Sequence, residues 1–297
     1  MEIRVLRYFL EAAREGNITR AAARLHISQP TLSKQLKDLE RELGKKLFVR
    51  GNYNIHLTDE GTLLRKRAED ILLMVDKTTA EFQALDDITG GDIHIGCAES
   101  DDFKYIARCI KILREQYPGI RCHLYSGNTD DVTGRLDRGL LDFSVIVENV
   151  DLSKYNYIDM QTSDQWGLLI RKDHPLAAKE VIHMEDLLDI PLICSRQGLE
   201  VDYPKWFHEK VDSLNIAATY NLLYNAAIMV REGLGCALTF DKLADTSSES
   251  ELCFRPLSPA LNTKMYIIWK KYQVFSKPTE LLLDVFKRRL NTEDLSS

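Results

Sequence analysis

A short alanine-rich segment followed by a proline-initiated amphipathic segment constrains most strongly what the N-terminal part of this chain can fold into. Residues 19–25 read TRAAARL, and their small side chains allow another helix to approach closely. Residues 28–40 read SQPTLSKQLKDLE. Ser28 is a good N-cap, and Pro30 is tolerated because the amides of a first helical turn lack intrahelical partners. The two segments together predict a helix-turn-helix.

The second predicted helix has an apolar side and a polar side. Leu32, Leu36 and Leu39 recur at spacings of four and three, which predicts a buried stripe. Gln29 and Lys34 stand near its start, where a helix can enter the DNA major groove. Gln can make a bidentate contact to adenine, and Ser, Thr and Lys can bond base edges or phosphates. A solvated amphipathic helix is the alternative interpretation of the same residues.

Charge is distributed unevenly along the chain. The net charge of the 297 residues is −6, but residues 1–70 carry 14 Lys and Arg against 10 Asp and Glu. The remaining residues carry 25 basic against 35 acidic side chains. A basic first segment on an acidic body indicates a polyanionic partner for that segment alone.

The composition argues against several classes of protein. No apolar stretch approaches the roughly 18 residues that cross a bilayer, and the charged N-terminus is unlike a signal peptide. We therefore expect a cytoplasmic protein that does not bind membranes. The six cysteines form no C-x-x-C pair, and the seven histidines form no H-x-x-x-H spacing. These patterns predict neither a metal site nor a cofactor.

The first sixty residues resemble the winged helix-turn-helix of the LysR-type transcriptional regulators. The resemblance rests on Ala21-Ala22, Leu25, Ser28-Gln29-Pro30, Ser33, Leu39-Glu40, Leu43-Gly44, Leu47-Phe48, Arg50, Leu57-Thr58 and Gly61. It implies a DNA-binding domain over residues 1–58, with residues 28–37 in the major groove of promoter DNA and residues 49–57 forming a wing against the backbone. The residues then expected to contact double-stranded DNA are Thr19, Ser28, Gln29, Pro30, Thr31, Ser33, Lys34, Lys37, Arg50 and Asn52.

A long helix is predicted over residues 59–87, where glycine occurs once and proline is absent. Its apolar residues approximate the three-four spacing of a seam between two helices. The resemblance implies a linker helix that pairs two copies of the chain, although docking on its own winged domain is an alternative. The residues expected at the dimer seam are Leu64, Ala68, Ile71, Val75 and Phe82.

After Gly91 the pattern changes to alternating strands and helices, which predicts an α/β domain with a largely parallel sheet. Two such units follow one another, which indicates two lobes with a ligand cleft at the strand ends. An effector-binding domain is expected over residues 88–297. It carries GDIHIG at 91–96, Tyr117-Pro118-Gly119, Gly139-Leu140-Leu141-Asp142, Asp173-His174-Pro175-Leu176 and Val230-Arg231-Glu232-Gly233-Leu234-Gly235. Over about residues 90–290, these segments resemble the periplasmic-binding-protein-like regulatory domain of the LysR-type family. The first lobe is expected over residues 91–162 and 268–297, and the second over 163–267. Leu238-Thr239-Phe240 departs from the family, where a proline is usual.

Polar residues that follow the predicted strands are the candidates for binding a small-molecule effector. They are Glu99, Ser100, Ser126, Gly127, Asn128, Thr129, Ser195 and Arg196. Hydroxyls and helix N-terminal amides can hold a carboxylate, and Arg196 could pair with it bidentately. Glu99 would repel an anion, so a carboxylate and a zwitterionic or amine-bearing metabolite both stay open as ligands.

The favoured interpretation is a sequence-specific transcriptional regulator that is not an enzyme and whose promoter binding responds to an effector. We expect lobe closure near residues 162–164 and 267–270, a homodimer or homotetramer, and RNA polymerase as a further partner if the protein activates transcription. A thiol-based redox sensor is an alternative, because Cys194 stands beside Arg196. An α/β enzyme and a stand-alone solute-binding protein are the other classes considered, but the chain has no catalytic motif and carries the DNA-binding segment.

Overall fold

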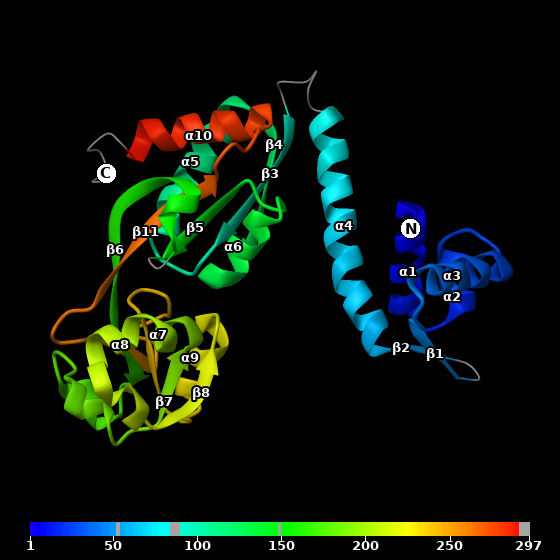
Figure 1. Cartoon of the computed structure of the whole chain (residues 1–297). Helices are drawn as coiled ribbons and strands as arrows, with labels where there is room; N and C mark the ends of the chain where they lie inside the picture. Colours follow the sequence, from blue (N-terminus) through cyan, green and yellow to red (C-terminus); the bar gives the residue numbers. More distant parts are fainter. Residues whose placement is uncertain (52–53, 84–89, 148–149, 291–297) are drawn as a thin grey trace. The chain divides into compact units, whose positions relative to one another are not determined.

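The computed structural model describes residues 1–51, 54–83, 90–147 and 150–290 (Figure 1). The chain forms two compact units, Met1–Phe82 and Gln83–Ser297. Within the described residues, no helix is long and apolar enough to cross a membrane.

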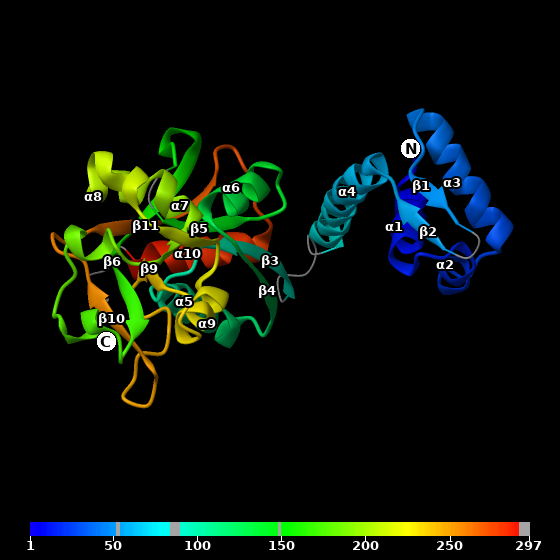
Figure 2. The same ribbon diagram turned by 90° about the horizontal axis from the view of Figure 1, so that it is seen from below.

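The N-terminal unit consists of three short helices, a small hairpin and one long helix. The helices are α1 (Ile3–Glu15), α2 (Ile18–Arg24), α3 (Gln29–Leu43) and α4 (Asp59–Gln83), and strands β1 (Phe48–Arg50) and β2 (Ile55–Leu57) pair antiparallel (Figure 2). Gly16 ends α1 with a φ of 58°, which a glycine adopts without strain. The side chain of Asn17 then caps α2, so the turn between these helices follows directly from two adjacent residues.

The leucine stripe of α3 forms the centre of this unit, as the sequence predicts. Leu32, Leu36 and Leu39 are buried against Phe9 of α1 and the alanines of α2. Ser28 caps α3 because its Oγ accepts a hydrogen bond from Thr31 N at 3.3 Å. The helix-turn-helix is therefore fixed by apolar packing on one side and by capping at its start.

The prediction for the long helix needs a correction. Ala68 is fully buried in the core of its own N-terminal unit, and Leu64 and Ile71 pack against the same core. Ala68 is therefore covered by its own winged domain and is not accessible for the expected contact with a second copy of the chain. Val75 is half-buried and Phe82 is 70% exposed, so these two residues are more accessible on α4 than Ala68.

The C-terminal unit is built on one continuous sheet with the order β4-β3-β5-β11-β6-β9-β7-β8, and β10 pairs with β6. Strands β3, β4 and β5 pair in parallel, and so do β7, β8 and β9, whereas β6, β10 and β11 pair antiparallel with their neighbours. The strands are β3 (Gly90–Cys97), β4 (Gly119–Ser126), β5 (Phe143–Val147), β6 (Tyr155–Arg171), β7 (Leu192–Ser195), β8 (Ile216–Tyr220), β9 (Cys236–Phe240), β10 (Leu252–Pro256) and β11 (Asn262–Lys270).

Helices cover both faces of this sheet and divide it into two lobes. In the first lobe, α5 and α10 lie side by side on one face, and α6 covers the other (Figures 1 and 2). In the second lobe, α8 packs on one face and α9 on the other. The helices are α5 (Phe103–Gln116), α6 (Thr129–Asp137), α7 (Arg196–Glu200), α8 (Asp202–Phe207), α9 (Leu223–Arg231) and α10 (Lys277–Leu290), with short 3-10 turns at Leu152–Lys154, Pro175–Ala178, Met184–Leu187 and His208–Ser213.

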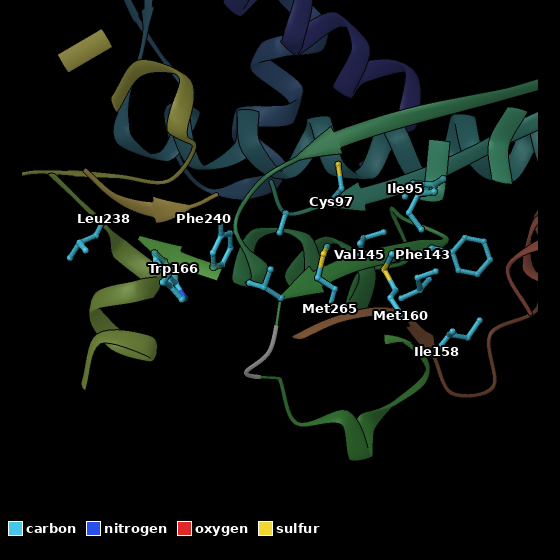
Figure 3. Close-up of a cluster of buried hydrophobic side chains, with 14 of the residues drawn as sticks. Ile95, Cys97, Phe143, Val145, Ile158, Met160, Trp166, Leu238, Phe240 and Met265 are labelled. Carbon is cyan, nitrogen blue, oxygen red and sulfur yellow. The ribbon is translucent and has the colours of Figure 1, made fainter. Parts of the chain in front are cut away.

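The two lobes share a buried apolar cluster that continues from one to the other. Phe143 and Met265 of the first lobe belong to the same cluster as Trp166, Leu238 and Phe240 of the second (Figure 3). Strand β6 runs from one lobe into the other, and it pairs with β11 first and with β9 and β10 afterwards. The lobes are therefore joined by sheet as well as by side-chain packing.

Several elements differ from the expectations. The sequence predicts only the second half of β6, because the first half carries Asp, Gln, Ser and Thr, and it predicts neither β8 nor β10. The return crossing also lies earlier than residues 267–270, since Met265 already pairs with Val147 of the first lobe. An irregularity in the β6–β11 register, with Gln161 at a φ of 55°, marks the region where β6 leaves the first lobe.

Candidate nucleic-acid interface and interlobe cleft

The start of α3 presents the polar residues that the sequence predicts for DNA contact. Ser28, Gln29, Pro30, Thr31, Lys34, Lys37 and Thr19 are exposed, and Ser33 is half-buried. The hydroxyls of Ser28 and Thr31 lie 2.7 Å apart, so the cap also orders the first turn. No acidic residue stands in that turn, and the positive end of the helix dipole therefore favours an approaching phosphate.

The hairpin after α3 corresponds to the predicted wing. Val49 pairs with His56, and Arg50 pairs with Ile55. Asn52 and the end of the predicted linker helix, residues 84–87, lie outside the described residues. The structure therefore places the backbone of the wing at Arg50 but leaves Asn52 as a prediction.

A cleft between the two lobes is the hollow that corresponds to the predicted effector site. Its cavity volume is about 50 Å³, and it is partly open to solvent. Four predicted residues line it, namely Glu99, Gly127, Asn128 and Ser195. The other lining residues are Ala98, Val147, Trp166, Gln197, Gly198, Asp202, Tyr220, Asn221, Leu223, Thr239, Phe240 and Leu243.

Two sets of hydrogen bonds connect the lobes at this cleft. Oε2 of Glu99, which follows β3, accepts a hydrogen bond from Leu223 N, the first amide of α9, at 2.5 Å. Gln197 and Thr129 bond reciprocally: Thr129 N donates to Oε1 at 3.0 Å, and Nε2 donates to Thr129 Oγ1 at 3.1 Å. The protein's own side chains thus satisfy the first amides of both α6 and α9.

The remaining predicted residues do not line the cleft. Ser100 is buried, and its Oγ accepts a hydrogen bond from Asp102 N at 3.0 Å, so it orders the turn before α5. Ser126 is exposed at the end of β4, and Arg196 is exposed with its Nε 3.5 Å from Thr219 Oγ1. Thr129 is buried, and its Oγ1 accepts a hydrogen bond from Gln197, which lines the cleft. Arg196 therefore does not line the cleft in this arrangement, and its pairing with a ligand carboxylate stays a prediction.

Sequence reasoning missed most of the second lobe's share of the cleft. Tyr220 ends β8, a strand that the sequence does not predict, and Asn221 follows it. Tyr220 OH donates to Leu238 O at 2.7 Å. Thr239 lies inside β9 and lines the cleft. It belongs to Leu238-Thr239-Phe240, the segment that departs from the family pattern. This departure was the sequence signal that could have identified Thr239 as a cleft residue, because a different residue in the cleft wall changes which ligands the wall can bind.

Burial changes the acid–base properties of two carboxyl groups in this region. Burial raises the pKa of Glu99, and the hydrogen bond from Leu223 N lowers it in part. Burial also raises the pKa of Asp164 to about 6, while the Ser100 hydroxyl opposes the shift and the charges of Asp102 and Asp101 add to it. Both carboxyl groups therefore have a stronger tendency to hold a proton than an exposed carboxyl.

The cysteines do not have the properties of a redox sensor. Cys194 is fully buried, and burial raises the pKa of its thiol to about 12, which argues against the alternative of a redox sensor at this residue. All six cysteines are free thiols, and five are buried. Burial also raises the pKa of the Cys109, Cys122 and Cys236 thiols to about 11.

Comparisons with known sequences identify both parts of the chain. Residues 3–62 match the family described as bacterial regulatory helix-turn-helix protein, lysR family, and residues 87–291 match the LysR substrate binding domain. An uncharacterized HTH-type transcriptional regulator, YvbU of Bacillus subtilis, is 24% identical over 99% of this chain and 100% of its own length. A probable RuBisCO transcriptional regulator of Synechocystis is 29% identical over 83% of this chain and 72% of its own length.

Solved structures have the same architecture. CbnR, a LysR family transcriptional regulator, matches with a TM-score of 0.75 and 17% identity over 97% of this chain and 99% of its own. CbnR in complex with its target DNA matches with a TM-score of 0.73 and 18% identity over the same shares. Full-length BenM matches with a TM-score of 0.53 and 25% identity over 99% of both chains.

Proposed function

The chain belongs to the LysR family of DNA-binding transcriptional regulators, and from this premise we propose that the start of α3 reads promoter DNA while an effector in the interlobe cleft modulates that binding. The observation that carries the DNA-reading role is the exposed polar first turn of α3 on a fully buried leucine stripe. A side chain on such a rigid support can meet base edges with little further loss of conformational entropy.

Gln29 is the residue for which we expect the clearest effect on sequence reading. Removing a bidentate contact to a base lowers discrimination by about 1–3 kcal/mol, so Gln29→Ala should weaken binding to a selected duplex by about 5-fold to 150-fold. Binding to random DNA should change little, because phosphate contacts supply that affinity. The duplex is obtained by selecting bound sequences from a random pool with the full chain, and affinities are measured by fluorescence anisotropy.

Gln116→Ala is the matched control for this experiment, since Gln116 is an exposed residue at the end of α5 in the other unit. Its affinity for both duplexes should equal that of the wild type. Equal affinity of Gln29→Ala and the wild type for the selected duplex would remove Gln29 from the proposed base contacts.

The effector role is proposed from the construction of the cleft. Strands β6 and β11 connect the lobes, and the contacts of Glu99 and Gln197 hold them in the arrangement described. A ligand that binds one arrangement of the lobes better than another shifts the population between them, and it shifts nothing if it binds both equally. The proposed consequence is a change in promoter occupancy.

Asn221 offers a test of the cleft that leaves the fold intact. It lines the cleft and is exposed, so Asn221→Ala should reduce the thermal stabilisation by an effector found in a metabolite screen of the full chain. Asn215→Ala, at an exposed position outside the lining, is the matched control and should keep the shift. A hit that stabilises Asn221→Ala and the wild type equally would argue for binding elsewhere.

We further propose that two or four copies assemble through the apolar surface left open on α4, which includes Leu63, Leu73 and Phe82. Pairing would place two α3 helices on two half-sites of the promoter. RNA polymerase is proposed as a partner where the protein activates transcription.

A further inference from the structure

We propose that the interlobe cleft takes a small molecule in which a protonated amine is joined to a short apolar body, with the Glu99 carboxylate as its counter-ion. This inference rests on the proposal that the cleft is the effector site. It goes further because it names the chemical class of the ligand and the group that selects it.

The ionisable side chains that line the cleft favour a cationic ligand. Among the described residues that line the cleft, the acidic ones are Glu99 and Asp202, and no Lys, Arg or His occurs. Asp202 is 2% exposed and lies 3.9 Å from Lys205 Nζ, so its charge is largely engaged within the protein. The half-buried carboxylate of Glu99 therefore gives the cleft its negative character.

The backbone amides at the cleft disfavour an anionic ligand, because the protein already satisfies them. A carboxylate ligand would need free amides or hydroxyls, but Leu223 N is bound by Glu99, and Thr129 N is bound by Gln197. The Ser195 hydroxyl caps α7 by accepting from Gly198 N at 3.3 Å and can still donate one hydrogen bond, so the engaged donors are the first amides of α6 and α9. An anion would thus have to displace these contacts and also approach the charge of Glu99, which costs free energy twice.

An ammonium group meets the opposite situation. A carboxylate has two oxygens that accept hydrogen bonds, so Glu99 can keep its bond from Leu223 N and accept from an N⁺–H donor as well. Charge-assisted hydrogen bonds of this kind are about twice as strong as neutral ones. The cation would also favour the ionised form of Glu99, whose pKa is raised by burial.

The aromatic lining supports a cation joined to an apolar body. Trp166, Tyr220 and Phe240 line the cleft, and the ring centroids of Trp166 and Phe240 are 4.3 Å apart (Figure 3). The indole of Trp166 is held in place because its Nε1 donates to Thr263 Oγ1 at 2.8 Å. Aromatic faces attract cations and also cover apolar groups, a combination that suits an alkyl or aryl amine.

Matched probes that differ only in the polar group test this inference on the full chain. The probes are phenethylamine, 2-phenylethanol and phenylacetate, together with butylamine, 1-butanol and butyrate. We expect the amines to raise the melting temperature and to bind more tightly than the alcohols and the acids by isothermal titration calorimetry. Glu99→Gln should weaken amine binding tenfold or more, because Gln keeps an acceptor for Leu223 N but loses the charge.

Glu115→Gln, at an exposed position on α5, is the charge-matched control and should bind the amines as the wild type does. Amine affinity should also fall as the pH is lowered through the raised pKa of Glu99, since protonation removes the counter-ion. Glu99→Gln should lose that pH dependence.

Three results would overturn the inference, and the first two leave the proposed function standing. If the acids bind the wild type more tightly than the amines, or if Glu99→Gln binds amines unchanged, the ligand class is wrong while the cleft remains an effector site. If no amine binds at millimolar concentration, the inference fails. The wider effector proposal then depends on whether any metabolite changes the footprint of the protein on its selected DNA.

Discussion

A Glu40→Ala variant is expected to lose about 3–5 kcal/mol of the free energy of unfolding of its N-terminal unit. Glu40 is 4% exposed at the end of α3, and its Oε1 accepts hydrogen bonds from Leu47 N at 2.9 Å and from Phe48 N at 3.4 Å. Its Oε2 lies 3.3 Å from Lys46 Nζ. Truncation leaves two buried amides without their acceptor, and each unpaired buried donor costs about 1–3 kcal/mol.

This loss is large for a unit of this size, since whole domains are stable by only about 5–15 kcal/mol. Glu40 joins α3 to β1, the first strand of the predicted wing. Its removal should therefore weaken binding to selected and random DNA alike. That pattern differs from Gln29→Ala, which should affect the selected sequence most. The two variants therefore distinguish a residue that supports the domain from one that reads DNA.

Native-state hydrogen exchange followed by mass spectrometry measures this effect within residues 1–82 of the full chain. Glu40→Gln should lose less stability, because its amide oxygen can still accept from Leu47 N. Glu69→Ala is the surface control: Glu69 is exposed on α4, and its pair with Arg65 at 3.9 Å contributes little. A loss below about 1 kcal/mol in Glu40→Ala would contradict the role assigned to this carboxylate.

Asp164→Asn is expected to stabilise the C-terminal unit by up to about 3 kcal/mol near pH 7. Asp164 is 6% exposed on β6, and among the described residues its Oδ2 has no hydrogen-bond partner. Its pKa is raised from 3.8 to about 6, so the folded state binds the proton more readily than the unfolded chain. The stabilising contribution of this proton is fully present below about pH 4 and is lost as the pH rises through about 6.

The asparagine variant removes the buried charge and should therefore lose this part of the pH dependence. Urea unfolding followed by tryptophan fluorescence measures it selectively, since all three tryptophans, Trp166, Trp206 and Trp269, belong to the C-terminal unit. Asp212→Asn, at an exposed position, is the control and should change stability little at any pH. An Asp164→Asn protein that is less stable than the wild type near pH 7 would show that the carboxylate has a favourable partner.

The position of Asp164 links this stability to the proposed regulation. It lies on the strand that connects the lobes and pairs with Thr263 of β11, and Asp101, Asp102 and Lys104 surround it from the turn that begins α5. A charge buried at this connection without full compensation lowers the stability of the arrangement described. Other arrangements of the lobes then lie closer to it in free energy, which is a requirement for an effector to shift the population.

Much of the N-terminal unit could be predicted from the sequence because local rules decide it. Ser28 caps α3 through an amide three residues away, Gly16 ends α1, and the leucines of α3 recur on one face. Each of these features depends on residues within one or two helical turns. The order of strands and helices in the C-terminal unit was predicted for the same reason, as far as each strand carried a continuous apolar run.

The site could be predicted only in part. Four of the eight residues proposed for the cleft line it, because polar residues after parallel strands gather at one edge of the sheet. Ser100 and Arg196 obey the same rule in sequence, but one turns into a buried loop and the other points to solvent. Nothing within a few residues of either position determines that choice.

The sequence by itself determined the family, the helix-turn-helix and the two-lobed plan, since motif spacing and hydrophobic periodicity are properties of neighbouring residues. Only the tertiary structure decided which side chains meet. Ala68 belongs to its own winged domain, Gln197 occupies the first amide of α6, and Glu99 that of α9. Gln197 and Thr129 are 68 positions apart in the sequence, and Glu99 and Leu223 are 124 positions apart. Such pairings depend on the packing of whole elements, and local sequence patterns do not contain that information.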